Sequence, residues 1–433
     1  MSAGLGTRAA ARRLRDYLQR RRGEMRDLLE RLVRAESPST VPAAQKPVLD
    51  LLENALMERG YRIHRLRGHR TGGHLFATPG DRSKNQLIQL LIGHCDTVWP
   101  LGTLDTMPVR CRDGKLYGPG AYDMKAGLVQ GIFALEALKV LDLQPGVAPV
   151  FFINSDEEIG SAESTPQIRR LARSANRAFV LEPSLGPKGK LKTQRKGVGR
   201  FIVRVVGKSA HAGLAPEQGA SAILELSFVI QQLFALNDVE RGITVNVGTI
   251  DGGIRPNVVA PESHAVVDVR VLRQEDEPAV AAAIRGLQPT IPGTQIIVEG
   301  RIGRQPMEKT PGNRRLWELA QEAASDLDID LEEATAGGGS DGNTTSLYTP
   351  TLDGLGAVGD EAHAPGEFVY LDSMAGARGA RRSPCTGRAY RQRTGVRKLV
   401  SRRSRKRKRL CLRSMSKRWC PSISGWTISS SPT

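Results

Sequence analysis

The chain has 433 residues, of which 39% are hydrophobic and 25% are charged. This length allows two domains, because single hydrophobic cores rarely grow beyond roughly 250 residues. No apolar run approaches the roughly 20 residues that a membrane-spanning helix needs, so the sequence predicts no membrane partner.

The formal net charge of +18 is confined to one end of the chain. Residues 375–433 contain 18 of the 63 Lys and Arg residues and no Asp or Glu, which leaves 45 basic and 45 acidic residues in positions 1–374. The body is therefore electrically balanced, and its charge gives no reason to expect that it binds nucleic acid.

The N-terminal segment lacks the apolar core of a secretory signal peptide, and its pattern predicts an amphipathic helix over residues 8–35 that stops before Pro38. The five cysteines are an odd number without a disulfide spacing. Both features favour a reducing compartment, and we expect a cytoplasmic protein.

Strands and helices then alternate, which predicts an α/β sheet with parallel strands. We expect helices at 44–59 and 125–141, strands at 61–66, 74–78, 87–93, 149–156 and 177–183, and a long Gly- and Pro-rich loop at 99–123. Loops of that length in a compact domain tend to be functional. In parallel sheets, sites are built at the carboxyl ends of the strands.

The pattern changes near residue 195. Four strand-like runs and two helix-like runs follow one another in the order βαββαβ, at 199–207, 221–236, 242–250, 265–272, 277–287 and 294–302. This order predicts an inserted α+β sandwich. After Pro306, the sequence predicts a helix over 313–327 that belongs again to the α/β part.

Polar residues follow these apolar strands or lie in the Gly-rich loops. They are His94, Asp96, Asp123, Asp156, Glu157, Glu158, Glu182, Asp341 and His363. Imidazole and carboxylate groups delivered from several strand ends suit a divalent-metal site, and zinc accepts both. Residues i and i+2 of a strand share a face, so Asp96 can accept the second ring N–H of His94 and orient it.

Each of these signals has a simpler explanation on its own. A histidine after an apolar run can be satisfied locally, "DEE" can be a solvated patch or a helix start, and "GGGSDG" can be a flexible loop. Their occurrence together, in order and in matching contexts, favours a metal site.

Seven stretches of the sequence together resemble the co-catalytic zinc exopeptidases. They are "GHCDTVWPLG", "YGPGAYDMKAGLVQGIFAL", "FFINSDEEIGS", "VLEPS", "GKSAHAGLAPEQGASAI", "GGGSDGN" and "GDEAHAPGEFV". That family includes glutamate carboxypeptidase, aminoacylase, acetylornithine deacetylase and succinyl-diaminopimelate desuccinylase, and the first branch is the most similar. The resemblance covers roughly residues 20–374.

The resemblance implies a fold and a division into domains. The expected fold class is α/β, with a central mixed, mostly parallel sheet flanked by helices and an inserted α+β, ferredoxin-like lid and dimerisation domain. The implied segments are the catalytic domain at 1–194 and 306–374 and the inserted domain at 195–305. A change in composition marks a basic tail at 375–433. A homodimer through the inserted domain is implied in the same way.

The resemblance also implies a role for each site residue. Asp123 would bridge two Zn²⁺ ions, with Co²⁺ or Mn²⁺ as substitutes, His94 and Glu182 would complete one metal site, and Glu158 and His363 the other. Glu157 would be the general base and Asp96 would orient His94. His211 would stabilise the oxyanion, and the substrate's carboxylate would be held by Asn257, Arg270, Gly338, Gly339 and Ser340.

The substrate contacts keep simpler alternatives. Arg270 can be an exposed strand residue that pairs with Asp268, and His211 can be an ordinary loop histidine. Cys95 should face away from the site and pack in the core, because a nucleophilic cysteine needs a base and an electropositive niche.

The tail, 375–433, departs from the family pattern, which continues with a helix. Our hypothesis is that it is translated from a shifted reading frame, in which case loss of the helix would expose apolar surface and favour aggregation. The alternative is an authentic arm that binds nucleic acid or an anionic surface.

The sequence therefore predicts a metallo-exopeptidase that hydrolyses the amide bond to a C-terminal amino acid, such as glutamate, in a small peptide or N-acyl amino acid. The alternative within the family is an N-acyl amino acid deacylase, a deacetylase or desuccinylase. The alternative outside it is a non-enzymatic binder that acts through the basic tail.

Overall fold

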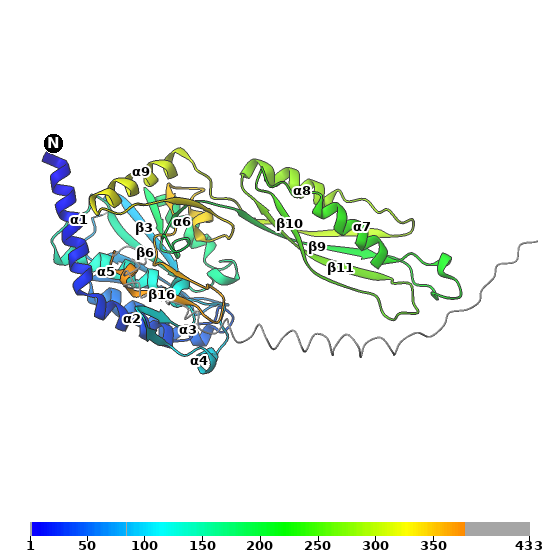
Figure 1. Ribbon diagram of the computed structural model, residues 1–433, viewed down its shortest axis with the longest axis horizontal. Helices are drawn as coiled ribbons and strands as arrows, with labels where there is room; N and C mark the ends of the chain where they lie inside the picture. Colours follow the sequence, from blue (N-terminus) through cyan, green and yellow to red (C-terminus); the bar gives the residue numbers. More distant parts are fainter. Residues whose placement is uncertain (1, 84, 377–433) are drawn as a thin grey trace, which may run out of the picture. The chain divides into compact units, whose positions relative to one another are not determined.

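A computed structural model describes residues 2–83 and 85–376 of the chain (Figure 1). The predicted tail, 375–433, lies outside the described residues except for Ala375 and Gly376. None of the described helices is long and apolar enough to cross a membrane.

A six-stranded mixed sheet forms the centre of the α/β part. Its strand order is β1-β2-β6-β3-β7-β14. The strands are β1 (Tyr61–Leu66), β2 (His74–Pro79), β3 (Ile88–His94), β6 (Ala148–Asn154), β7 (Arg177–Val180) and β14 (Thr351–Leu352). The pairs β6-β3, β3-β7 and β7-β14 are parallel, and β1-β2 and β2-β6 are antiparallel. This is the mixed, mostly parallel sheet expected for the fold class.

Helices cover both faces of this sheet, because successive side chains of a strand point to opposite faces. Leu91 of β3 packs in a core with the helices on one face, and its neighbour Ile92 packs against α6 on the other. The helices are α1 (Ser2–Arg20), α2 (Arg22–Arg34), α3 (Pro42–Glu58), α5 (Ala126–Val140), α6 (Thr165–Ser174) and α9 (Pro311–Asp326). The single helix predicted over 8–35 is thus two, divided at Arg21.

The inserted segment forms an antiparallel sheet with the order β10-β11-β9-β12, covered on one face by two helices (Figure 1). Its elements run βαββαβ along the chain, as predicted: β9 (Gly197–Val206), α7 (Ala222–Phe234), β10 (Thr244–Gly252), β11 (Glu262–Val271), α8 (Glu277–Arg285) and β12 (Gln295–Arg304). The face of β9 that points away from the helices is exposed at Arg200 and Arg204. The domain boundaries themselves stay a prediction.

Short elements complete the α/β part and carry much of the site. They are α4 (Thr103–Thr106), β4 (Arg110–Arg112), β5 (Lys115–Tyr117), η1 (Ala121–Lys125), η2 (Glu157–Ile159), β8 (Leu191–Arg195), β13 (Glu333–Ala336), α10 (Asp341–Thr345), β15 (Gly359–Asp360), β16 (Phe368–Tyr370) and α11 (Leu371–Met374). Two further turns, η3 (Pro216–Gln218) and η4 (Gln274–Asp276), lie in the inserted segment. Strands β15, β16, β5 and β4 form a sheet in that order, so the predicted loop at 99–123 contains a hairpin.

Candidate metal centre and active site

The predicted metal ligands converge at the carboxyl ends of the central strands. His94 is the last residue of β3, Glu182 follows β7, and Glu157 and Glu158 begin η2 just after β6. Asp123 lies in η1. Strands β6, β3 and β7 are adjacent and parallel, so their carboxyl ends meet at one edge, where sites in such sheets are built.

Asp123 lies between two histidines. Its Oδ1 is 3.3 Å from Nε2 of His94, and its Oδ2 is 3.5 Å from Nε2 of His363. His94 Nε2 is also 3.4 Å from Oε1 of Glu182, and His363 Nε2 is 3.1 Å from Oε2 of Glu158. One carboxylate therefore faces a His–Glu pair on each side.

The donor set fits divalent cations. Nε2 of His94 and Oδ1 of Asp123 are buried without a hydrogen-bond partner of good geometry, and buried polar atoms are rarely left so. Two sets of three ligand atoms, from His94, Asp123 and Glu158 and from His94, Glu157 and Glu182, lie within 4.8 Å of one another. Imidazole nitrogens and carboxylate oxygens in this number suit zinc and related ions.

The electrostatics of the cluster keep the Asp123 carboxyl ionised. Burial opposes ionisation of Asp123, but the rings of His363 and His94 outweigh it and hold the pKa of this carboxyl well below its usual range. Asp123 and Glu158 raise the pKa of His363 to about 10. His363 also has a left-handed backbone, with φ at 60°, a conformation that non-glycine residues adopt mainly where the surroundings impose it.

Asp96 organises the turn that carries the two glutamates. Its carboxylate accepts hydrogen bonds from the backbone N–H groups of Glu157 and Glu158, both at 3.2 Å, and from the Ser39 hydroxyl at 2.6 Å. Nδ1 of His94 is 3.1 Å from the backbone oxygen of Asp96 and 3.4 Å from its Oδ1. Asp96 thus lies where it can orient His94. It also holds the turn η2 in place, a role that the sequence did not indicate.

Glu157 is paired with an arginine of the inserted segment. Nη1 of Arg304 donates to its Oε1 at 2.6 Å, and Nη2 donates to the Ser161 hydroxyl at 2.7 Å. Burial raises the pKa of Glu157 to about 8, although the positive charge of Arg304 acts in the opposite direction. A carboxyl group with a pKa in this range can both accept and donate a proton near neutral pH.

Two supporting groups were not among the predicted site residues, although Glu367 lies within the stretch "GDEAHAPGEFV". The buried Glu367 carboxylate accepts hydrogen bonds from the backbone N–H groups of Gly120, Tyr122 and Asp123, at 2.9 to 3.1 Å, and from the Trp99 indole at 2.9 Å. Burial raises its pKa to about 7, although these donors act against the rise. Glu367 therefore holds the loop that carries Asp123.

Arg195 is the second supporting group. Its guanidinium makes a bidentate contact with Asp353, at 2.7 and 3.0 Å, and lies 3.3 Å from Oε2 of Glu182. It also donates to the backbone oxygens of Gly338 and Gly339, at 3.1 and 3.3 Å. A buried arginine thus joins a candidate metal ligand to the Gly-rich loop.

The predicted substrate contacts are not gathered at the cluster. His211 is exposed, and its Nδ1 accepts hydrogen bonds from the backbone of Gly213 and Leu214. Asn257 is exposed, and its backbone oxygen accepts from Ala212. The buried Ser340 hydroxyl donates to Asp353 and caps α10.

Arg270 pairs with Asp268, which was the simpler alternative to substrate binding in the sequence analysis. Its guanidinium binds both oxygens of Asp268, at 2.7 and 2.9 Å, and its Nη1 lies 3.5 Å from the backbone oxygen of Gly337. Cys95, as expected, packs in the core, where burial raises the pKa of its thiol to about 12.

Comparison with known proteins identifies the family, since residues 90–379 match peptidase family M20/M25/M40. The chain belongs to this family. Carboxypeptidase G2 of Pseudomonas sp. (strain RS-16) is 30% identical over 357 residues, which cover 80% of this chain and 85% of that protein. Acetylornithine deacetylase of Myxococcus xanthus is 28% identical over 298 residues, which cover 60% of this chain and 75% of that protein.

A solved structure shows the same fold for this M20 chain. The YXEP protein of Bacillus subtilis, described as a dinuclear metal-binding peptidase of the M20 family, matches with a TM-score of 0.61 and 14% identity over 82% of this chain and 95% of that chain. Family membership makes the protein a metal-dependent peptidase or amidohydrolase, as the resemblance implied.

Proposed function

We propose that the protein is a dizinc exopeptidase that hydrolyses the amide bond to a C-terminal amino acid, with glutamate as the first candidate. The observation that carries the proposal is the placement of Asp123 between His94 and His363, with Glu157 beside them. The glutamate preference is supported by the 30% identity to a protein named carboxypeptidase G2.

The ligand set divides into two halves around Asp123. His94 and Glu182 would hold one ion with it, and Glu158 and His363 the other. When bound, two divalent cations supply positive charge that polarises an amide carbonyl and lowers the pKa of water toward about 7.

Glu157 would move the proton in the reaction. Its carboxylate takes a proton from the water that attacks the carbonyl carbon, and it gives that proton to the amide nitrogen as the C–N bond breaks. Arg304 binds Oε1, and Oε2 makes no hydrogen bond to the residues that the structure describes.

Substrate binding would draw on the inserted segment. Arg270, Asn257 and the loop Gly338–Ser340 would bind the substrate's carboxylate, and His211 would stabilise the oxyanion. Arg270 binds Asp268 through Nε and Nη2, so its Nη1, which lies 3.5 Å from the Gly337 backbone oxygen, would be the group that reaches the substrate. Closure of the inserted segment over the substrate would bring His211 to the cluster and exclude water.

A homodimer through the inserted segment is part of the proposal. Strand β10 is an edge strand, and exposed apolar side chains lie on it and on α7, including Ile250 at 64% and Leu224 at 52% exposure. Unpaired edges with apolar side chains favour pairing with a second chain. A second copy could also supply His211 to its partner's site.

The second candidate is an N-acyl amino acid deacylase of the same family, which the 28% identity to an acetylornithine deacetylase favours. The two functions share the metal chemistry and differ in which side of the amide is recognised. Because hydrolysis releases both halves of the substrate, kcat/KM is compared while the acyl group is varied at fixed glutamate and while the amino acid is varied at fixed acetyl. The side whose change lowers kcat/KM more identifies the function.

The test of the function combines metal content, turnover and Glu157→Gln. We expect close to two equivalents of zinc in the loaded protein, glutamate release that a chelator abolishes, and a loss of at least about 10³-fold in kcat for Glu157→Gln. Glu322→Gln, at an exposed carboxylate of α9, is the control and should change kcat little. Full turnover by Glu157→Gln, or fewer than two bound ions, would disprove the mechanism.

A further inference from the structure

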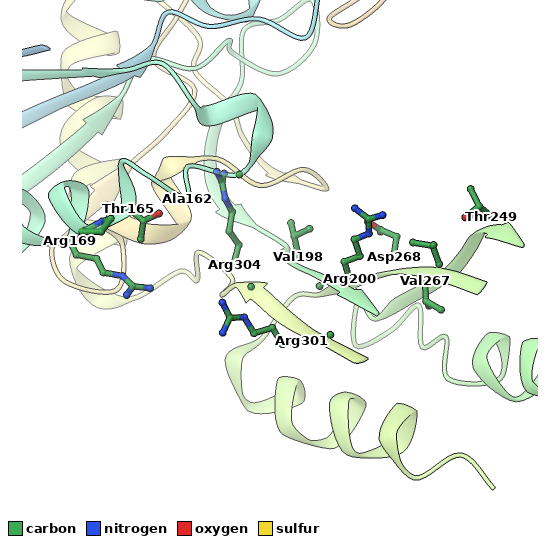
Figure 2. A pocket seen from close by; sticks show the side chains of 17 residues that line it. Ala162, Thr165, Arg169, Val198, Arg200, Thr249, Val267, Asp268, Arg301 and Arg304 are labelled. Carbon is green, nitrogen blue, oxygen red and sulfur yellow. The ribbon is translucent and has the colours of Figure 1, made fainter. Parts of the chain in front are cut away.

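A large arginine-rich cavity adjoins the metal cluster without containing its ligands. It has a volume of about 840 Å³ and lies between the start of α6 and the exposed face of the β9-β11-β12 sheet. Its charged lining residues are Arg169, Arg200, Asp268, Arg301 and Arg304. Figure 2 shows Arg169 projecting from α6 on one side and Arg200 and Arg301 from strands on the other.

The cavity and the catalytic cluster share one residue. Arg304 lines the cavity and also donates to the Glu157 carboxylate at 2.6 Å. Gly160, three residues after Glu157, lines it too. A molecule in the cavity would therefore lie beside the arginine that binds the proposed general base.

Two arginines of the sheet face each other directly across neighbouring strands. Arg200 of β9 is the register partner of Arg301 of β12, and both side chains are exposed. Like charges directly opposite on adjacent strands destabilise a sheet. Stability of the sheet alone therefore gives no reason for this pair.

The carboxylates around the cavity are already engaged. Asp268 is the register partner of Arg200 on the other side, but Arg270 binds both of its oxygens. Glu157 is bound by Arg304. Glu299, on the same face of β12 as Arg301, is the register partner of Ile202 and lies outside the cavity lining.

Three guanidinium groups remain for another ligand. Within the described part of the chain, Arg169, Arg200 and Arg301 form no hydrogen bond or ion pair with a carboxylate. Guanidinium groups bind carboxylates in a planar, bidentate geometry, and a concave wall of one charge sign concentrates ligands of the opposite sign.

We propose that Arg169, Arg200 and Arg301 form a subsite for a carboxylate of the substrate beyond the one at the reacting residue. This inference rests on the proposed amide hydrolysis and defines its substrate class, namely amides with two or more carboxylates on the portion that occupies the cavity. Binding of that carboxylate offsets the repulsion between Arg200 and Arg301.

The test compares two substrates that differ by a single charge. N-Benzoyl-glutamate and N-benzoyl-glutamine share the acyl group and the amide bond, and only the first has a side-chain carboxylate. For the full-length zinc-loaded protein we expect a higher kcat/KM for the glutamate substrate. In Arg200→Gln/Arg301→Gln this preference should fall by roughly 10-fold or more, while kcat/KM for the glutamine substrate changes little.

The matched control is Arg204→Gln. Arg204 lies on the same strand and face as Arg200, but it is paired with Glu262 and does not line the cavity. Its variant should keep the wild-type preference, and every variant carries the same basic tail. An unchanged preference in the double variant would overturn the subsite.

A binding experiment separates failure of the subsite from failure of the proposed function. If the wild-type protein cleaves neither substrate, the proposed function is wrong, and glutarate and neutral glutaramide are titrated calorimetrically into each zinc-loaded protein. Glutarate binding that is roughly 10-fold weaker in the double variant than in Arg204→Gln still supports the anionic subsite. Equal glutarate binding in the two variants, or none in the wild type, disproves it.

Discussion

Glu367 is not a predicted metal ligand, but it holds the backbone of one, Asp123, in position. Four N–H groups from Trp99, Gly120, Tyr122 and Asp123 converge on its carboxylate, which is buried. Carboxylates of this kind orient ligands and influence metal affinity. The backbone position of Asp123 therefore depends on a side chain almost 250 residues later in the chain.

Replacement of Glu367 by Gln should weaken metal binding. The amide NH₂ would place a donor against the N–H groups that the carboxylate now accepts, and buried unsatisfied donors are costly. We expect zinc affinity to fall by roughly 10- to 100-fold and unfolding free energy by about 2 kcal/mol, measured by competition with a chromophoric chelator and by denaturant titration. Glu299→Gln, on exposed β12, should change neither quantity, and wild-type affinity in Glu367→Gln would refute this role.

At the scale of elements, the hairpin of β4 and β5 positions the His363 loop. Asp113 and Gly114 form the turn, with φ at 52° and 73°, as a two-residue hairpin turn with positive φ at both positions requires. Strand β5 then pairs with β16, which follows His363. The Asp-Gly pair is a strong signal for a β-hairpin. The sequence therefore indicated the β4-β5 hairpin, although we predicted a loop over 99–123.

Helix α5 approaches the end of β7 so closely that only glycine fits. A Cβ at Gly127 would lie 1.9 Å from the backbone oxygen of Leu181, the neighbour of Glu182. This contact sets the position of the chain just before a candidate metal ligand.

Gly127→Ala should therefore destabilise the protein by about 2–4 kcal/mol, because neither backbone can yield without repacking the core. The thermal midpoint and zinc content should both decrease. Gly146→Ala is the control, since a Cβ there has no atom within 4 Å. A Gly127→Ala protein with wild-type stability would show that α5 can shift freely.

At the scale of the whole molecule, the buried acids make metal-free stability depend on pH. Folding raises the pKa of Glu157 from 4.5 to about 8 and that of Glu367 from 4.5 to about 7, mainly through burial. Neighbouring carboxylates raise that of His363 from 6.5 to about 10. Each group binds its proton more tightly in the folded state, so stability is lost as pH rises through these values.

Metal-free protein should therefore unfold at a lower temperature at pH 8 than at pH 5.5, by a few degrees. Asp123 acts oppositely, but its contribution is lost only below about pH 4. Zinc should reverse the trend, because deprotonated ligands bind it better. Scanning calorimetry across this pH range, with chelator and with zinc, measures how the unfolding midpoint depends on pH in each state. A metal-free midpoint that rises with pH would contradict the raised pKa values of Glu157, Glu367 and His363.

The sequence by itself determined the fold class and predicted the types of ligand residue. His94, Asp156–Glu158 and Glu182 each follow an apolar run that predicts a strand. Parallel strands place their carboxyl ends at one edge of the sheet, so the sequence alone indicated that these residues lie close together. The βαββαβ order of the inserted segment followed from local periodicity alone.

Only the tertiary structure decided which groups support and surround that site. Glu367 lies in the stretch "GDEAHAPGEFV", but no local pattern indicates its role or the roles of Arg195 and Arg304. Each acts through partners more than ten residues away in the chain. The facing of Arg200 and Arg301 depends on strand register, which a one-residue shift would abolish. Contacts between residues far apart in the chain depend on how the whole core packs. A local sequence pattern therefore cannot predict them.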